Sequence, residues 1–137
     1  MIQNTIRYIS IDDNPVDLLI LKEYASIFPF LQHAGSFSTP AEGLAGIDTL
    51  HPDLVFLDIE MPNYAGYEIV KFFENISFEI IFVTAYDQYA LRAFEIAAVD
   101  YLLKPIDIER LKSAVSKVKT RVDLKQNAER LELLSKT

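Results

Sequence analysis

The stretch Leu54-Val55-Phe56-Leu57-Asp58 decides the fold class of this sequence. Four apolar residues in a row, without polar alternation, are typical of a strand buried on both faces, as in the centre of a parallel sheet. The run stops at a carboxylate. We therefore expect a central strand at residues 54–57, with Asp58 at the edge of the sheet where that strand ends.

Four further apolar runs flank this stretch, at residues 6–11, 31–37, 79–84 and 99–103. Segments with helical periodicity separate them, which is the pattern of βα units around a parallel sheet. The run at 31–37 is more polar and weaker, so we expect it at an edge. Five such units with right-handed crossovers make a doubly wound α/β sheet. The strand order 2-1-3-4-5 is one of two common choices, and spacing alone does not select it.

The first two helices have clear start signals. Asn14 can cap a helix that accepts Pro15 in its first turn. The second helix begins at the capping box Thr39-Pro40-Ala41-Glu42 and ends near Leu50. In the first helix, the apolar positions that fall on one face are Val16, Ile20, Tyr24 and Ile27.

Three later helices are expected. A short one runs from Gly66 to Phe73, and Asp87 can cap another that carries Leu91 and Phe94. The last starts near Asp107, and its stripe consists of Leu111, Val115, Val118 and Val122. After about residue 123 the stripe shifts phase to Leu124, Ala128 and Leu131. We expect a domain at 1–122 and a helical extension or linker at 123–137, as a solvated helix rather than a coiled-coil dimer, because no heptad is sustained.

Composition limits the class of protein. The chain has 137 residues and 15.6 kDa, half of them hydrophobic, which suits one domain with its own core. It has no cysteine, which argues against a disulfide scaffold or a cysteine-based site. No apolar run approaches the roughly 18 residues of a membrane span, and no signal peptide precedes the domain. We expect a soluble, cytoplasmic protein.

The net charge of −7 is unevenly distributed. Residues 1–103 hold 4 Lys and Arg against 15 Asp and Glu, a net −11, whereas residues 104–137 hold 9 against 5, a net +4. An acidic body repels a nucleic-acid backbone, so we expect no direct binding of nucleic acid by this segment. The acidity is also compatible with a cation site.

Chemically active side chains follow four of the expected strands. They are Asp12, Asp13, Asp58, Thr84 and Lys104. Carboxylates about 4 Å apart repel each other by roughly 4 kcal/mol at an effective dielectric of 20, so three of them need a cation or a proton. Oxygen ligands without histidine or thiol favour Mg²⁺, with Mn²⁺ as an alternative, and Mg²⁺ commonly completes its shell with phosphoryl oxygens.

Asp58 is the best candidate for a nucleophile, because it stands alone after a wholly apolar strand and opens a loop. A carboxylate can form an acyl phosphate when a metal and a lysine neutralise the transferred group. The adjacent Asp12 and Asp13 suit metal binding, and Thr84 and Lys104 would donate hydrogen bonds to phosphoryl oxygens.

Residues 6–122 resemble the receiver domain of two-component response regulators. The matching segments are Ile11-Asp12-Asp13, the run from Asp58 to Gly66 (DIEMPNYAG), Val83-Thr84-Ala85, and the run from Asp100 to Pro105 (DYLLKP). Each segment alone is weak evidence for the family, whereas all four in this order and spacing are a specific match. The resemblance implies a flavodoxin-like (βα)5 fold with strand order 2-1-3-4-5, and a signalling switch rather than an enzyme.

The resemblance also implies roles for individual residues. A partner histidine kinase would phosphorylate Asp58, with Mg²⁺ held by Asp13, Asp58 and the backbone carbonyl of Ile59, and by Asp12 through water. Thr84 would then move toward the phosphoryl group and Tyr101 would turn inward. That movement would reshape the face formed by the helix around Leu91 and Phe94, the strand at 99–103 and the last helix, a face that could also form a homodimer. At the phosphoryl site, Thr84 and Lys104 are the expected contacts.

The segments around Thr84 and Tyr101 are most similar to receivers of LytTR-type transcription regulators. In that subfamily a DNA-binding output domain follows the receiver, so we expect either a receiver cut from a longer protein or a single-domain regulator, and the basic tail favours the former. Glu60 and Tyr86, two residues beyond Asp58 and Thr84, occupy positions that tune phosphate lifetime in the family.

Ordinary structural roles remain open for these residues. Asp12-Asp13 could be a turn, Lys104-Pro105 a plain turn or, by the resemblance, a cis peptide bond, and Tyr101 part of the core. His33 and His51 are expected at the surface or in a cap. Two other functions also remain open: a Mg²⁺-dependent aspartyl phosphohydrolase with Glu60 as general acid, and a receiver-like interaction module that is not phosphorylated.

Overall fold

The computed structural model describes residues 5–61, 64–65, 77–86 and 98–135, without the side chains of residues 60, 64 and 65. The expected helices at 66–73 and around residues 91–94 lie outside this part. The elements are β1 (Ile6–Ile11), α1 (Pro15–Ala25), β2 (Leu31–Phe37), α2 (Pro40–Leu50), β3 (Leu54–Leu57), β4 (Glu60–Met61), β5 (Tyr64–Ala65), β6 (Glu79–Thr84), β7 (Asp100–Leu103) and α5 (Ile108–Ser135).

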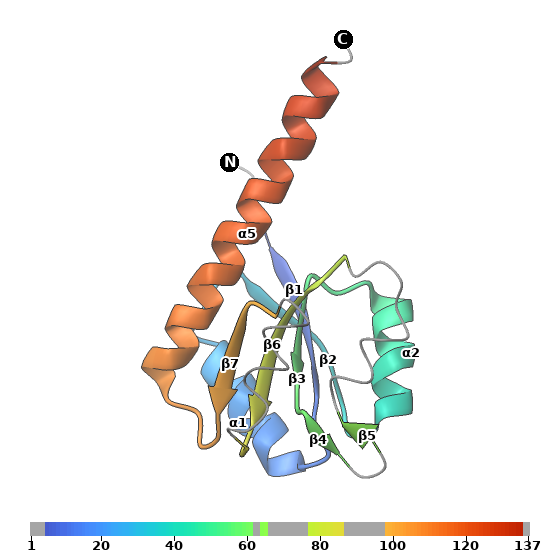
Figure 1. The fold of residues 1–137 in the computed structure, drawn as a ribbon, viewed down its shortest axis with the longest axis vertical. Coiled ribbons are helices and arrows are strands. Elements are labelled where there is room, and N and C mark those ends of the chain that lie inside the picture. Colours follow the sequence, from blue (N-terminus) through green and yellow to red (C-terminus); the bar gives the residue numbers. More distant parts are fainter. Residues whose placement is uncertain (1–4, 62–63, 66–76, 87–97, 136–137) are drawn as a thin grey trace.

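Five parallel strands form the central sheet in the order β2-β1-β3-β6-β7 (Figure 1). Counted along the chain within this sheet, the order is 2-1-3-4-5, so the predicted fold class is confirmed. The strand of residues 54–57 is central and β2 is at an edge, as expected. The register pairs Leu57 with Ile11 on one side and with Phe82 on the other.

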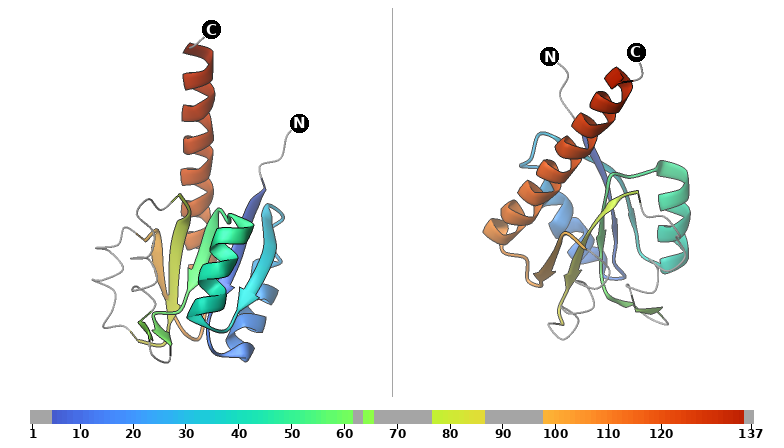
Figure 2. Two further views of the ribbon diagram at one scale, coloured as in Figure 1. Left: turned by 90° about the vertical axis from the view of Figure 1, so that its right-hand side faces the viewer. Right: turned by 45° about the horizontal axis from the view of Figure 1, so that its top comes forward.

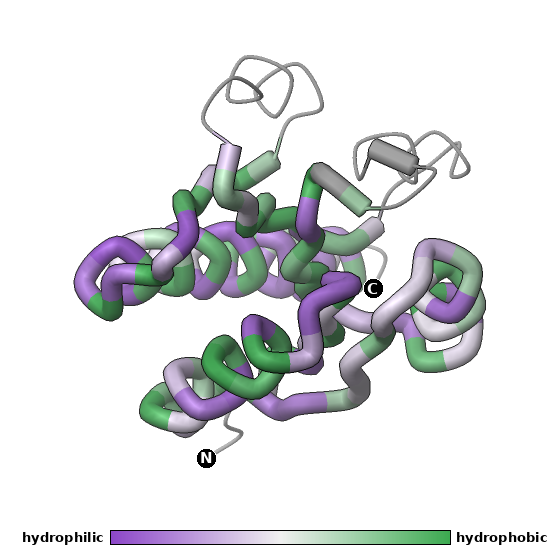
Figure 3. The backbone as a smooth tube through the Cα atoms, turned by 90° about the horizontal axis from the view of Figure 1, so that it is seen from below, coloured by the Kyte–Doolittle hydropathy of each residue, from purple (hydrophilic) through white to green (hydrophobic). Residues whose placement is uncertain are grey.

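Two hydrophobic layers cover the sheet, because alternate residues of each strand point to opposite faces. On one face α1 and α5 pack on the strands, with buried residues such as Leu21, Val115 and Phe56. On the other face α2 packs with residues such as Ile47, Val55 and Phe82. Figures 1 and 2 show the sheet between these helices. Figure 3 shows that the described helices carry both hydrophobic and hydrophilic residues, as expected for helices with one side packed on a sheet.

The helix boundaries follow from local chemistry. The side chain of Asn14 accepts hydrogen bonds from the amides of Val16 at 3.0 Å and Asp17 at 3.2 Å, and Pro15 is the first residue of α1. Thr39 caps α2 through a 3.2 Å bond from the amide of Glu42. His51 ends α2 in the left-handed region with φ 48°, so its expected place in a cap is confirmed.

The predicted apolar face of α1 is confirmed only at Tyr24, which is partly buried against the core. Val16 is 61%, Ile27 51% and Ile20 39% exposed, whereas Leu21 and Ala25 are buried against the sheet. The helix carries apolar residues around most of its circumference, so periodicity alone did not identify the face that packs. The loop expected at residues 59–65 contains the antiparallel strands β4 and β5. These two-residue strands are too short to show an alternating apolar pattern in the sequence.

Helix α5 continues well beyond the body of the domain (Figure 1). Its predicted stripe is largely confirmed, since Leu111, Val115 and Val118 are fully buried. Beyond residue 123 its exposed leucines are Leu124, Leu131, Leu133 and Leu134, each more than 60% exposed. Among the helices that the structure describes, none is long and apolar enough to cross a membrane.

Candidate functional site

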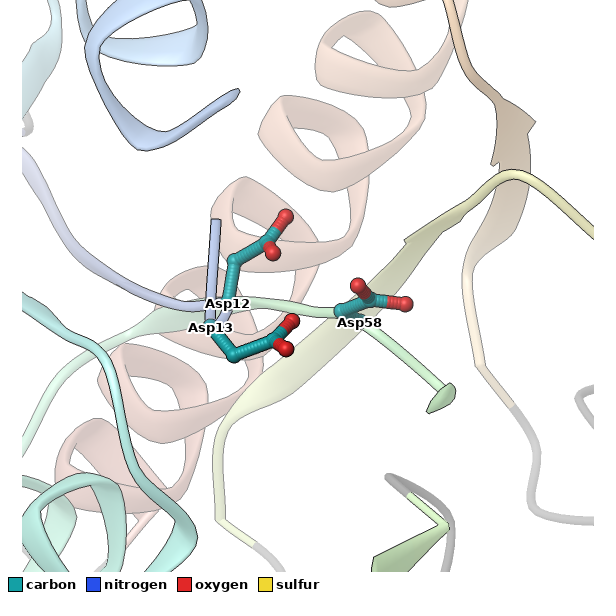
Figure 4. Close-up of side chains that lie close together, drawn as sticks. All are labelled: Asp12, Asp13 and Asp58. Carbon is teal, nitrogen blue, oxygen red and sulfur yellow. The ribbon is translucent and has the colours of Figure 1, made fainter. Parts of the chain in front are cut away.

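Parallel pairing brings the acidic strand ends together. The amide of Asp12 donates to the carbonyl of Phe37 at 3.0 Å, and the amide of Asp58 donates to that of Ile11 at 2.9 Å. Each aspartate is therefore fixed by the strand beside it. Carboxylate oxygens of Asp12, Asp13 and Asp58 lie within 4.8 Å of one another, beside the ends of β1 and β3 (Figure 4). The cluster predicted from the strand ends is thus present.

The three acids differ in exposure. Asp12 and Asp58 are each only 6% exposed, whereas Asp13 is exposed. Burying a carboxylate is costly unless it is paired. Asp12 uses one oxygen to accept a 3.0 Å bond from the amide of Asn14, and both buried carboxylates have an ionic partner in Lys104. Asp13 is the acid that solvent reaches most freely.

Lys104 compensates the negative charge from the end of β7. Its ammonium lies 2.7 Å from Asp12 Oδ2, 2.8 Å from Asp17 Oδ2 and 3.2 Å from Asp58 Oδ2. Burial acts to lower the pKa of Lys104, but the carboxylates outweigh burial and hold that pKa above its usual value. The lysine is therefore a permanent cation. The peptide bond that follows it, Lys104-Pro105, is cis, as the resemblance implied.

Asp17 is the residue of this site that the sequence did not predict. It lies in the first turn of α1, and with Asp12 and Asp58 it lines a small cavity of about 10 Å³. Neighbouring strands place Asp12, Asp58 and Lys104, whereas the rotation of α1 places Asp17. The sequence signal for Asp17 was an acidic residue in the first turn of the helix that follows Asp12 and Asp13. Aspartate is common in the first turn of any helix, so this signal was not specific.

Thr84 lies at the end of β6, next to Lys104. It is fully buried, and its carbonyl accepts a 2.7 Å bond from the amide of Lys104. Its hydroxyl accepts a 3.3 Å bond from the amide of Tyr86. The predicted pair of phosphoryl-binding side chains therefore comes from adjacent strand ends. Ile59, whose carbonyl is a predicted metal ligand, is buried directly after Asp58.

Tyr101 links β7 to the segment after Thr84. Its ring is half-buried against the layer that includes Phe82, and its hydroxyl donates a hydrogen bond to the carbonyl of Tyr86. The side chain of Tyr86 is 46% exposed. The side chain of Glu60, the other predicted lifetime-tuning residue, lies outside the described part of the chain. The helix expected around Leu91, one of the three elements of the predicted output face, also lies outside the described part.

The donor set fits a hard divalent cation. Carboxylate oxygens from three residues converge, and such ligands are those that Mg²⁺ prefers. A site of this kind is also suited to a phosphoryl group, since Lys104 and the hydroxyl of Thr84 supply donors near the nucleophile's strand. The arrangement is a buried carboxylate, Asp58, beside two further carboxylates and the ammonium of Lys104.

Comparison with known proteins agrees with this geometry. The family model described as a response regulator receiver domain matches residues 9–116. The transcriptional regulatory protein BtsR of Escherichia coli K12 is 37% identical over 116 residues, covering 83% of this chain and 48% of that protein. An uncharacterized response regulatory protein of Vibrio cholerae is 52% identical over 85 residues, covering 61% and 36%. The chain spans about half or less of the length of these relatives.

Solved structures share the fold. The response regulatory domain of mrkE from Klebsiella pneumoniae has a TM-score of 0.79 at 26% identity, covering 87% of this chain and 99% of that one. The REC domain of AraT, a response regulator from Geobacillus stearothermophilus, has a TM-score of 0.79 at 25% identity, covering 89% and 98%. Both agree with the sheet order and with the helices described above.

Proposed function

The chain belongs to the response regulator receiver domain family, and on this premise we propose that it is a phosphoacceptor switch whose Asp58 receives a phosphoryl group from a partner histidine kinase. A receiver domain is a signalling module and not an enzyme. The observation that carries the proposal is the buried Asp58 carboxylate, 3.2 Å from Lys104 and within 4.8 Å of two further carboxylates.

The cation of the proposed site is Mg²⁺. Asp13, Asp58 and the carbonyl of Ile59 would hold it directly, and Asp12 through water. When bound, the metal supplies positive charge that offsets the repulsion between Asp58 and an incoming phosphoryl group. The oxygen-only donor set supports this assignment over Zn²⁺, which commonly takes histidine or thiolate ligands.

Phosphoryl transfer in this proposal uses the chain's own groups. A carboxylate oxygen of Asp58 forms the new bond to phosphorus, and the bond from phosphorus to the kinase's histidine nitrogen breaks, leaving its electron pair on that nitrogen. Lys104 and Thr84 donate hydrogen bonds to the phosphoryl oxygens. Because Lys104 already contacts Asp58, it needs little movement to reach the transferred group.

The proposed output depends on Thr84 and Tyr101. The amide of Tyr86 bonds the hydroxyl of Thr84, and the carbonyl of Tyr86 accepts from Tyr101. Movement of Thr84 toward a phosphoryl group would therefore displace Tyr86 and change the hydrogen bond between Tyr86 and Tyr101. Tyr86 and Glu60 are the proposed determinants of phosphate lifetime, since both follow site residues by two positions.

The exposed face of α1 supports the proposal of a protein partner. Val16 and Leu19 are each more than 60% exposed, and Asp17 of the same turn belongs to the acidic site. A partner that covers these apolar side chains would bring its reactive group beside Asp58. We assign this surface to the kinase, and the cytoplasm, where such a kinase would meet ATP, is the proposed location of the protein.

A DNA-binding output domain of LytTR type is the proposed downstream partner. The support is that a relative, BtsR, is a transcriptional regulatory protein and is about twice as long as the segment it shares with this chain. In this proposal residues 1–122 are the receiver and residues 123–137 lead toward that output. Dimer formation through the face of β7 and α5 is a further element of the proposal.

Intact mass spectrometry tests the phosphoacceptor proposal. Incubated with Mg²⁺ and acetyl phosphate, the wild type should gain the mass of one phosphoryl group, and Asp58→Asn should gain none. Asp48→Asn, which removes an exposed carboxylate from α2, is the matched control and should behave as the wild type. An unmodified wild type would favour the unphosphorylated interaction module, and rapid turnover of unrelated phosphomonoesters would favour the phosphohydrolase.

A further inference from the structure

Lys104 has three carboxylate partners, and they are not equivalent. Its Nζ is 2.7 Å from Asp12 and 2.8 Å from Asp17, but 3.2 Å from Asp58. An ammonium has three N–H donors, and three carboxylates account for all of them. A phosphoryl group on Asp58 turns that carboxylate into a neutral acyl group and carries the negative charge farther from the backbone, so Lys104 can follow this charge only by loosening its contact with Asp12 or with Asp17.

Exposure indicates which partner leaves. The side chain of Asp12 is only 9% exposed, so it would lose an ionic partner inside the protein. The side chain of Asp17 is 28% exposed, so water can replace the lysine there. Asp17 also lies in the first turn of α1, where the helix N-terminus favours an anion. Of the two, Asp17 loses Lys104 at the lower free-energy cost.

We propose that Asp17 is a positioning residue that holds Lys104 in the unphosphorylated state and gives up this contact when Asp58 carries a phosphoryl group. This inference rests on the proposed function of Asp58. Asp17 thus competes with the phosphoryl group for one ammonium, and it draws that ammonium away from the carboxylates that would hold Mg²⁺. The residue sets the balance between the two states without contacting the transferred group.

Asp17→Asn should change two affinities in opposite directions. Beryllofluoride, a phosphoryl mimic, should bind about two- to tenfold more tightly in the presence of Mg²⁺, because Lys104 no longer has a charged competitor. Mg²⁺ alone should bind more weakly, because Lys104 turns fully to Asp12 and Asp58. A purely structural role would weaken both.

The experiment is calorimetric titration of Mg²⁺ and then of beryllofluoride into the wild type, Asp17→Asn and Asp17→Ala, after thermal unfolding has shown that each is folded. Glu23→Gln is the control, since it removes an exposed charge from the same helix. In a Lys104→Met background, Asp17→Asn should have no effect on beryllofluoride affinity, because Asp17 acts through Lys104.

Unchanged or weaker beryllofluoride binding by both Asp17 variants, with a wild type that binds it, would overturn this inference and leave the proposed function intact. An equal change in Glu23→Gln would also overturn it, since the effect would then be one of net charge. A wild type that neither binds beryllofluoride nor gains a phosphoryl group would overturn the proposed function and this inference together.

Discussion

The hydroxyl of Tyr101 donates a hydrogen bond to the backbone carbonyl of Tyr86, the residue whose amide bonds the hydroxyl of Thr84. The side chain of Tyr101 thereby joins β7 to the segment that follows β6, in addition to the ladder between the two strands. Because the acceptor is a backbone atom, the contact depends on the identity of residue 101 and not on that of residue 86.

Tyr101→Phe removes this bond and little else. We expect the free energy of unfolding to fall by about 1 kcal/mol or less, since the donor is partly solvated. Phosphorylation of Asp58 should persist, but the chemical-shift change that it causes at the amide of Tyr86 should shrink. Tyr24→Phe, which removes the hydroxyl of a tyrosine on α1, is the control, and NMR of both variants with and without beryllofluoride makes the comparison. An undiminished shift change in Tyr101→Phe would contradict the link.

Asp13→Asn separates metal binding from stability. Asp13 is exposed, and the ion pairs of Lys104 are with Asp12, Asp17 and Asp58. We expect the affinity for Mg²⁺ to fall about tenfold or more because one anionic ligand is lost, while the free energy of unfolding without metal changes by less than about 0.5 kcal/mol. Calorimetric titration and urea unfolding measure the two quantities. If the variant bound Mg²⁺ as tightly as the wild type, Asp13 would not be a metal ligand.

Asp100→Asn tests the pH dependence of stability. Asp100 is bonded by Arg110 at 2.9 Å and by Lys117 at 2.9 Å, from two turns of α5. Burial acts to raise the pKa of Asp100, but these bonds outweigh burial and hold the pKa below its usual value. A lowered carboxyl pKa stabilises the folded state above the unfolded value of about 3.9, and that stabilisation is lost as the pH falls through the folded value.

The variant should therefore be less stable than the wild type at pH 7, and the difference should shrink as the pH falls below about 4. Urea unfolding from pH 7 to pH 3 measures it. Asp48→Asn controls for the change in net charge, because its carboxylate is exposed on α2. A difference that stayed constant with pH would show that Asp100 acts through packing and not through its charge.

Gly46→Ala tests the packing of α2 on the sheet. A Cβ at residue 46 would lie 2.5 Å from the ring of Phe37, and a Cβ at Gly35 would lie 2.9 Å from the same ring. The ring is held between two glycines. Alanine normally stabilises a helix relative to glycine, but here we expect a loss of about 1–3 kcal/mol in the free energy of unfolding. Asp48→Ala on the exposed side of α2 is the control, and a stabilised Gly46→Ala would contradict the close packing.

Much of the site was predictable because it depends on strand ends alone. Asp12, Asp58 and Lys104 follow apolar runs, and parallel pairing brings such ends to one edge of the sheet. The resemblance supplied the strand order, which spacing did not. What the sequence could not specify is the rotation of each helix about its axis. For that reason Asp17 was missed and the exposed Val16 was assigned to the packed face.

Helix α5 has the geometry of a lever. Its 28 residues extend about 42 Å at 1.5 Å per residue, and Arg110 and Lys117 fasten its first turns to Asp100, the residue before Tyr101. Residues 118–135 lie beyond this attachment and extend about 27 Å, so each degree of tilt of a rigid helix about it moves the far end by about 0.5 Å. A rearrangement of β7 too small to alter the core would thus be magnified at the distant end into a displacement of several ångströms.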